Sequence, residues 1–161
     1  MELNTIIHKE TLADRVKSYQ VYSPYIAKKA QPGQFVILRL SEDGERVPLT
    51  IVDQDAEAGT IRLIVQTVGK STARMDQIEI GGCIHDILGP LGNPSDIQNF
   101  GRVCVVGGGV GAAVAYPVAR ALKQAGNEVT TIVGARNKDL LILKDELAAV
   151  SDHLYYTTDD G

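Results

Sequence analysis

Cysteine is scarce in this sequence, which has only Cys83 and Cys104 among its 161 residues. The two thiols do not form a Cys-x-x-Cys pair, and two cysteines are too few for the four ligands of an iron–sulfur cluster or a structural zinc. We therefore expect no metal site in these residues. Cys104 lies in an apolar run, where we predict a small residue of the core.

Long hydrophobic runs and clusters of basic residues are missing as well. The longest uncharged stretch, 103–119, contains glycines and a proline and falls short of the ~20 apolar residues of a membrane helix. Lysine and arginine are scattered through a chain of net charge −4, which argues against nucleic-acid binding. The first residues, MELNTIIHKE, lack the basic and apolar regions of an export signal. We expect a cytoplasmic protein without membrane or nucleic-acid partners.

The first hundred residues have the pattern of short strands separated by turns. Ile61, Leu63 and Val65 alternate with their neighbours as in a strand with one buried face. One interruption, 71–78, reads as a short helix capped by Ser71 or Thr72. Strands are predicted at 5–11, 15–22, 34–40, 49–53, 60–68 and 83–88. Their number and spacing favour an antiparallel barrel.

The pattern changes after residue 101. A strand at 103–106, a helix ending near 123, a strand at 129–133, a helix at 143–150 and a strand at 154–157 alternate, which is typical of a parallel α/β sheet. Pro117 should kink the first helix or delay its start. We predict a β + α/β fold: an N-terminal antiparallel β-barrel over 1–98, followed by an incomplete parallel α/β nucleotide-binding domain over 99–161.

A glycine-rich turn opens the second domain. Gly107, Gly109 and Ala112 match the pattern G-x-G-x-x-A directly after a strand and before a helix. Glycines there allow a tight turn and let a pyrophosphate approach the backbone near the helix N-terminus. The alternative is a turn with a purely structural role.

The next strand ends without the acidic residue that often binds the ribose of NAD. Instead it is followed by Arg136, which suits the 2′-phosphate of NADP. A solvated loop arginine is the other interpretation. The pattern leaves the choice between NAD and NADP open.

Two stretches of the first domain, ERVPLTIVD and QTVGKSTARM, contain charged and hydroxyl residues in arrangements that a plain barrel does not require. In the first, Arg46, Pro48 and Thr50 would share one face of an extended segment. In the second, Gly69 allows a tight turn, and the following helix offers free N–H groups to an anion. Taken together, the two stretches predict a second phosphate-bearing ligand.

With these motifs in order, the chain resembles the ferredoxin–NADP reductase superfamily. It is similar to the small electron-transfer subunits of NADH-dependent ferredoxin–NADP reductases and sulfide dehydrogenases, and to that of dihydroorotate dehydrogenase. The resemblance rests on the segments RVPLTI, VGKST, LGPLGNP, VGGGVGAA, GARNKDLLI and TTDDG.

The resemblance implies a role for each matching residue. Thr50 would be the catalytic residue, beside the reactive flavin nitrogen, and Gly89, Leu91 and Gly92 would lie where flavin and nicotinamide meet. FAD would be bound by Arg46, Pro48, Leu49, Thr50, Val65, Gln66, Thr67, Gly69, Lys70, Ser71 and Thr72. The dinucleotide, NAD(P)H, would be bound by Gly107, Gly108, Gly109, Val110, Gly111, Gly134, Ala135, Arg136, Asp159, Asp160 and Gly161.

The resemblance also has departures. The superfamily places an arginine three residues before the hydroxyl and a tyrosine between them, whereas Arg46 and Thr50 are four residues apart and Leu49 replaces the tyrosine. The family domain continues beyond TTDDG, so the chain is expected to be truncated at its C-terminus. A [2Fe–2S] cluster is expected only in that missing segment.

The implied activity is NAD(P)H-dependent flavin oxidoreduction. Electrons would pass between NAD(P)H and FAD and on to an iron–sulfur partner, either a larger flavin and iron–sulfur subunit or a ferredoxin, although the truncated chain alone is expected to turn over poorly. The alternatives are a dihydroorotate dehydrogenase-type electron-transfer subunit, a non-catalytic nucleotide-sensing module, and a purely structural fragment.

Overall fold

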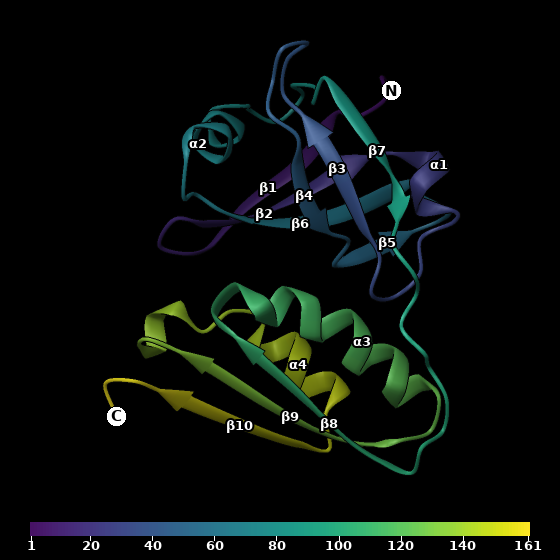
Figure 1. Cartoon of the computed structure of the whole chain (residues 1–161), viewed down its shortest axis with the longest axis vertical. Coiled ribbons are helices and arrows are strands. Elements are labelled where there is room, and N and C mark those ends of the chain that lie inside the picture. The colour runs from purple at the N-terminus through teal and green to yellow at the C-terminus, as the bar shows by residue number, and fades with distance from the viewer. The chain divides into compact units, whose positions relative to one another are not determined.

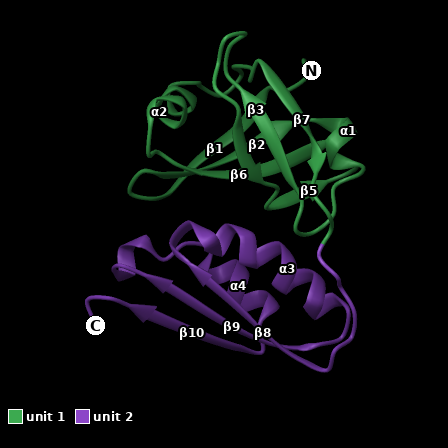
Figure 2. Cartoon of the chain, viewed as in Figure 1, with its two compact units in different colours: residues 1–94 green, residues 95–161 purple.

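Antiparallel strands fill the first half of the computed structural model, which describes residues 1–161 (Figure 1). The chain divides into two units, Met1–Pro94 and Ser95–Gly161 (Figure 2). The sequence places its domain boundary slightly later, between residues 98 and 99.

Unit 1 contains two antiparallel sheets. The first has the order β1-β2-β6-β5, and the second has the order β4-β3-β7. The strands are β1 (Ile6–Ala13), β2 (Val16–Tyr22), β3 (Phe35–Arg39), β4 (Val47–Thr50), β5 (Asp53–Asp55), β6 (Thr60–Gln66) and β7 (Asp86–Leu91). Two short helices, α1 (Pro24–Ala27) and α2 (Lys70–Asp76), complete the unit. The predicted antiparallel β architecture is confirmed.

The core of unit 1 follows from the alternation of its strands. Ile61, Leu63 and Val65 of β6 point into one cluster with Val36 and Leu38 of β3, and all five are at most 3% exposed. Burying each such side chain contributes about 1.5–3 kcal/mol. On β3, the intervening residues Phe35, Ile37 and Arg39 are only partly buried, so a ligand can reach that face.

The predicted strand at 49–53 is wrong, because the chain changes sheets within it. The Ile51 N–H donates to the Gln34 carbonyl (3.1 Å) beside β3, and the Val52 N–H donates to the Arg62 carbonyl (2.9 Å) on β6. Both side chains are buried. The segment therefore ends β4 in one sheet and begins β5 in the other.

Helix α2 begins one residue before its predicted start, and its cap differs. Gly69 is the N-cap residue, and the Thr72 hydroxyl accepts hydrogen bonds from the N–H groups of Val68 (2.9 Å) and Gly69 (3.0 Å). Thr72 thus ties the helix to the segment before it from the third helical position. Ser71 makes a tertiary contact instead of capping the helix.

Unit 2 is a parallel three-stranded sheet of order β10-β9-β8, as predicted. Its elements in chain order are β8 (Arg102–Gly108), a 3₁₀ turn η1 (Gly109–Gly111), α3 (Ala112–Gln124), β9 (Glu128–Ala135), a 3₁₀ turn η2 (Lys138–Leu140), α4 (Lys144–Val150) and β10 (His153–Thr158). Pro117 lies inside α3, and the regular helix starts only after η1.

The prediction that Cys104 is a core residue is wrong, because this thiol is exposed. Helices α3 and α4 cover the same face of the sheet (Figure 1). Side chains of β8 alternate between the two faces, so Cys104 and Val106 point to the uncovered face, where Val106 is 69% exposed. No α-helix in the structure combines the length and the apolar composition needed to cross a bilayer.

Candidate functional site

Strand β4 presents two of the predicted site residues away from the core of unit 1. Val47 and Leu49 pack against the buried cluster, whereas Pro48 is exposed and Thr50 is half-buried. Alternation along the strand thus leaves Pro48 and Thr50 on the outer face, with the exposed Arg46 just before it. The side chain of Leu49 faces the core, so only its backbone is available to a ligand there.

The outer face of the sheet β4-β3-β7 brings Thr50 close to residues that are distant in sequence. Phe35 of β3 pairs with Thr50 on one side and with Leu91 of β7 on the other. Gly92 follows with φ of 81°, and a Cβ there would lie 2.9 Å from the Phe35 ring. Nothing in the sequence pattern singles out Phe35, because its place beside Thr50 depends on cross-strand register.

The loop that carries Arg46 is held against helix α2. The Ser71 hydroxyl donates to Glu45 Oε2 (2.5 Å), and Arg74 Nη1 donates to the Ser41 hydroxyl (3.0 Å). The two segments enclose a cavity of about 350 Å³. It is lined by Leu40, Ser41, Asp43, Gly44, Glu45, Lys70, Ser71 and Arg74. The predicted residues Lys70 and Ser71 thus lie beside the residue that precedes Arg46.

The start of α2 provides polar groups suited to an anion. The first N–H groups of a helix have no acceptor within it, and those of Lys70, Ser71 and Thr72 are in that position. A Cβ on Gly69 would meet no atom within 4 Å, so the space next to this segment is open. Lys70 is exposed and adds a positive charge.

The end of β6 leads into this segment. Gln66 and Thr67 are half-buried, whereas Val65 is 3% exposed and belongs to the core. The Thr67 N–H donates to the Arg15 carbonyl (2.8 Å), so the turn between β1 and β2 lies against the chain that precedes Gly69.

The C-terminal end of α2 is fixed by a charged cluster. Asp76 forms ion pairs with Lys17 and Lys9, and the Tyr19 hydroxyl donates to it (3.5 Å). The hydrogen bond from Lys17, reinforced by the nearby positive charges, lowers the pKa of Asp76. Burial and the Asp76 carboxylate raise the pKa of Tyr19. The cluster joins α2 to β1 and β2.

The glycines of unit 2 divide into two groups by their surroundings. A Cβ on Gly107 would lie 3.1 Å from Ala115 Cβ and 3.2 Å from Ala112 N, so this glycine lets β8 and α3 approach closely. A Cβ on Gly108, Gly109 or Gly111 would meet no atom within 4 Å. The turn therefore presents bare backbone to open space, and the half-buried Val110 lies within it.

The carboxyl ends of β9 and β10 lie next to this turn in the sheet order, with β9 between β8 and β10. The Asp159 N–H donates to the Ala135 carbonyl (3.2 Å), and a Cβ on Gly134 would lie 3.2 Å from Thr157. Arg136, Asp159, Asp160 and Gly161 are all exposed. The structure thus places the dinucleotide residues predicted from sequence at the carboxyl ends of the three neighbouring strands.

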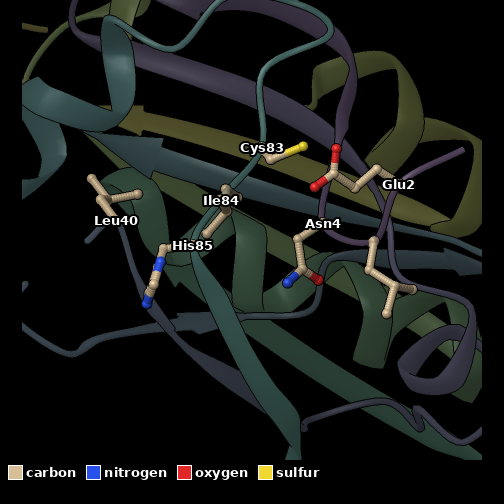
Figure 3. A pocket seen from close by; sticks show the side chains of 7 residues that line it. Glu2, Asn4, Leu40, Cys83, Ile84 and His85 are labelled. Atoms are coloured by element: carbon tan, nitrogen blue, oxygen red, sulfur yellow. The ribbon is translucent and has the colours of Figure 1, made fainter. Parts of the chain in front are cut away.

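A separate cavity of about 740 Å³ contains none of the predicted site residues. It is lined by Glu2, Leu3, Asn4, Leu40, Cys83, Ile84 and His85 (Figure 3). The side chains of Cys83 and His85 point in different directions, so they form no nucleophile–base pair (Figure 3). No group of three or more His, Cys, Asp or Glu side chains in the chain is placed to hold a metal ion.

Comparison with known proteins connects this geometry to a family. The family model described as the oxidoreductase FAD-binding domain matches residues 4–95. The chain is 51% identical over 159 residues to a dihydroorotate dehydrogenase B (NAD(+)) electron transfer subunit homolog from Thermotoga maritima, covering 99% of this chain and 56% of that protein. It is 32% identical over 166 residues to the dihydroorotate dehydrogenase B (NAD(+)) electron transfer subunit of Geobacillus thermodenitrificans, covering 99% of this chain and 64% of that protein.

A solved structure gives the same result. The NADH-dependent reduced ferredoxin-NADP oxidoreductase structure is 49% identical to the chain, with a TM-score of 0.94, over 100% of this chain and 58% of that one. The chain therefore spans little more than half the length of these proteins. The resemblance to the ferredoxin–NADP reductase superfamily is confirmed, and the chain belongs to the oxidoreductase FAD-binding domain family.

Proposed function

We propose that the chain binds FAD through unit 1 and the nicotinamide dinucleotide through unit 2, as part of an electron-transfer subunit. The observation that carries the proposal is the pair of hydrogen bonds, Ser71 to Glu45 and Arg74 to Ser41, that joins the Arg46 loop to α2. These bonds bring together the two segments that, taken together, predict a phosphate-bearing ligand. The family to which the chain belongs gives that ligand as FAD.

The residues of unit 1 fit the parts of FAD. The Lys70 to Thr72 amides, with the side chains of Lys70 and Arg46, would bind the pyrophosphate. Gln66 and Thr67, at the end of β6, would contact the ribityl or adenosine side, together with the backbone of Val65. The outer face around Pro48, Thr50, Phe35 and Leu91 offers the flat, largely apolar surface that a flavin ring requires.

The residues of unit 2 fit a dinucleotide. Gly107 to Gly111 offer open backbone at the start of α3, a 13-residue helix whose N-terminal N–H groups and dipole favour a pyrophosphate. Gly134, Ala135 and Arg136, with Asp159 and Asp160 beside them, would bind the ribose end. Arg136 suits the 2′-phosphate of NADP, whereas the neighbouring aspartates suit the hydroxyls of NAD.

The chemistry belongs to the cofactors, and the chain binds and orients them. Bound FAD would supply the chemistry of accepting a hydride from NAD(P)H and of single-electron transfer to an iron–sulfur acceptor. The Thr50 hydroxyl would donate a hydrogen bond to the flavin, and Pro48 would keep the adjacent strand edge free of a competing N–H donor. A larger iron–sulfur subunit or a ferredoxin is the proposed acceptor of the electrons.

Substitution at Thr72 tests this assignment in a FAD titration of the purified chain. An aspartate keeps an oxygen acceptor for the Val68 and Gly69 amides but adds a negative charge beside the proposed pyrophosphate. Thr72→Asp should therefore weaken FAD binding at least about tenfold. Thr72→Ser, which keeps the hydroxyl, is the matched control. Equal affinity of both variants for FAD would refute the assignment.

A further inference from the structure

The turn between β1 and β2 carries an arginine in a conformation that favours glycine. Arg15 has φ of 59°, a left-handed backbone conformation, in the loop that follows a register shift between Thr11 and Ala13 in the pairing of β1 with β2. Turns of this kind usually place glycine at such a position, because glycine has no Cβ to collide with the backbone. An arginine at such a position raises the question of what its side chain does.

The same turn lies next to the proposed FAD site. The Arg15 carbonyl accepts a hydrogen bond from the Thr67 N–H (2.8 Å), and Thr67 leads through Val68 and Gly69 into α2. The turn between β1 and β2 is therefore attached to the segment that would carry the FAD pyrophosphate. Val68 in this segment is 74% exposed, which leaves the surface beside Arg15 open.

The positively charged side chains around this segment also differ in whether they have a hydrogen-bond or ion-pair partner. Lys9 and Lys17 are engaged by Asp76, and Arg74 is engaged by Ser41. In contrast, the structure shows no hydrogen bond or ion pair for the exposed side chains of Arg15 and Lys70. Lys70 is one of the cations assigned to the pyrophosphate, and Arg15 is a second exposed cation, attached to the same segment through the bond between its carbonyl and Thr67.

We propose that the Arg15 guanidinium binds the pyrophosphate of FAD. This inference rests on the proposed function of unit 1 and adds a residue that neither the sequence motifs nor the family resemblance indicated. Hydrogen bonds between a guanidinium and phosphate oxygens are strong and frequently bidentate. The unfavourable backbone conformation of Arg15 is then the cost of placing a cation at this turn.

Four variants test the proposal by FAD titration and thermal unfolding. Arg15→Gly relieves the backbone conformation, so its melting temperature should be unchanged or higher, while its FAD affinity should fall about tenfold. Arg15→Gln should show a similar loss of affinity, and Arg15→Lys should keep most of it. Lys28→Gln removes an exposed charge beside α1 and should leave FAD binding unchanged.

The outcomes separate this proposal from the function on which it rests. If Arg15→Gly binds FAD within twofold of the natural chain while Thr72→Asp does not, the Arg15 contact is wrong and the FAD site stands. If Arg15→Gly loses affinity together with a lower melting temperature, the arginine serves the fold and the proposal is overturned. If the natural chain binds no FAD, both proposals are wrong.

Discussion

Gly107 is the residue at which β8 and α3 come closest. A methyl group there would approach Ala115 Cβ and the Ala112 backbone to 3.1–3.2 Å. Gly107→Ala should therefore destabilise unit 2 by about 1–3 kcal/mol, the usual cost of forcing extra volume into a packed site. Urea unfolding followed by circular dichroism measures the change.

Gly108 provides the matched control for that experiment. It is the next residue of the same strand, has an ordinary extended backbone, and has open space where its Cβ would be. Gly108→Ala should change the free energy of unfolding by less than about 0.5 kcal/mol. Equal effects of the two variants would contradict the close approach of strand and helix at Gly107.

Individual residues also show what a sequence can and cannot indicate. Leu63 and Val65 were predictable core residues because alternation along β6 determines their side. Cys104 follows the same apolar pattern but is exposed, because burial of a strand depends on whether helices cover both of its faces. Phe35 lies beside Thr50 only through the pairing of β3 with β4, and no local pattern encodes that register.

At the scale of elements, α2 is attached to β1 and β2 through Asp76. The pKa of this carboxylate is lowered below 3.8 in the folded chain, so the unfolded chain binds protons more readily. The contribution of the Asp76 carboxylate to the free energy of unfolding is therefore fully present above pH 3.8. It is lost as the pH falls through the lower pKa of the folded chain. The urea midpoint of the natural chain should fall over that acidic range.

Asp76→Asn should remove this part of the pH dependence. The variant should be less stable at pH 6, because Lys9 and Lys17 lose their charged partner, and its midpoint should change less on acidification. Glu57→Gln, in an exposed turn, serves as the control and should behave as the natural chain does. A variant with an unchanged pH profile would show that Asp76 does not couple α2 to the strands.

The elements themselves were predictable to different degrees. The three strands and two helices of unit 2 follow from long, regular patterns, and their order was predicted correctly. The chain at 49–53 was not predictable, because Ile51 and Val52 are equally apolar although their N–H groups bond toward different sheets. The short helix α1 and strand β5 have too few residues to produce a pattern of their own.

For the whole molecule, composition and pattern were enough to predict a β unit followed by a parallel α/β unit. They also located the anion-binding candidates, because glycines at strand–helix turns have a physical reason to be there. They did not predict that Glu45 and Ser41 would join the Arg46 loop to α2, since those contacts connect residues about 30 positions apart. The proposed FAD site is therefore a property of the folded unit.

The FAD content of the purified chain tests the central claim most directly. The chain is saturated with FAD, freed of unbound flavin and then denatured, and the released flavin is quantified against protein. One FAD per chain is the expected result, since unit 1 has a single segment suited to the pyrophosphate. A colourless chain that releases no flavin, and that leaves the fluorescence of added FAD unchanged, would contradict the proposed function.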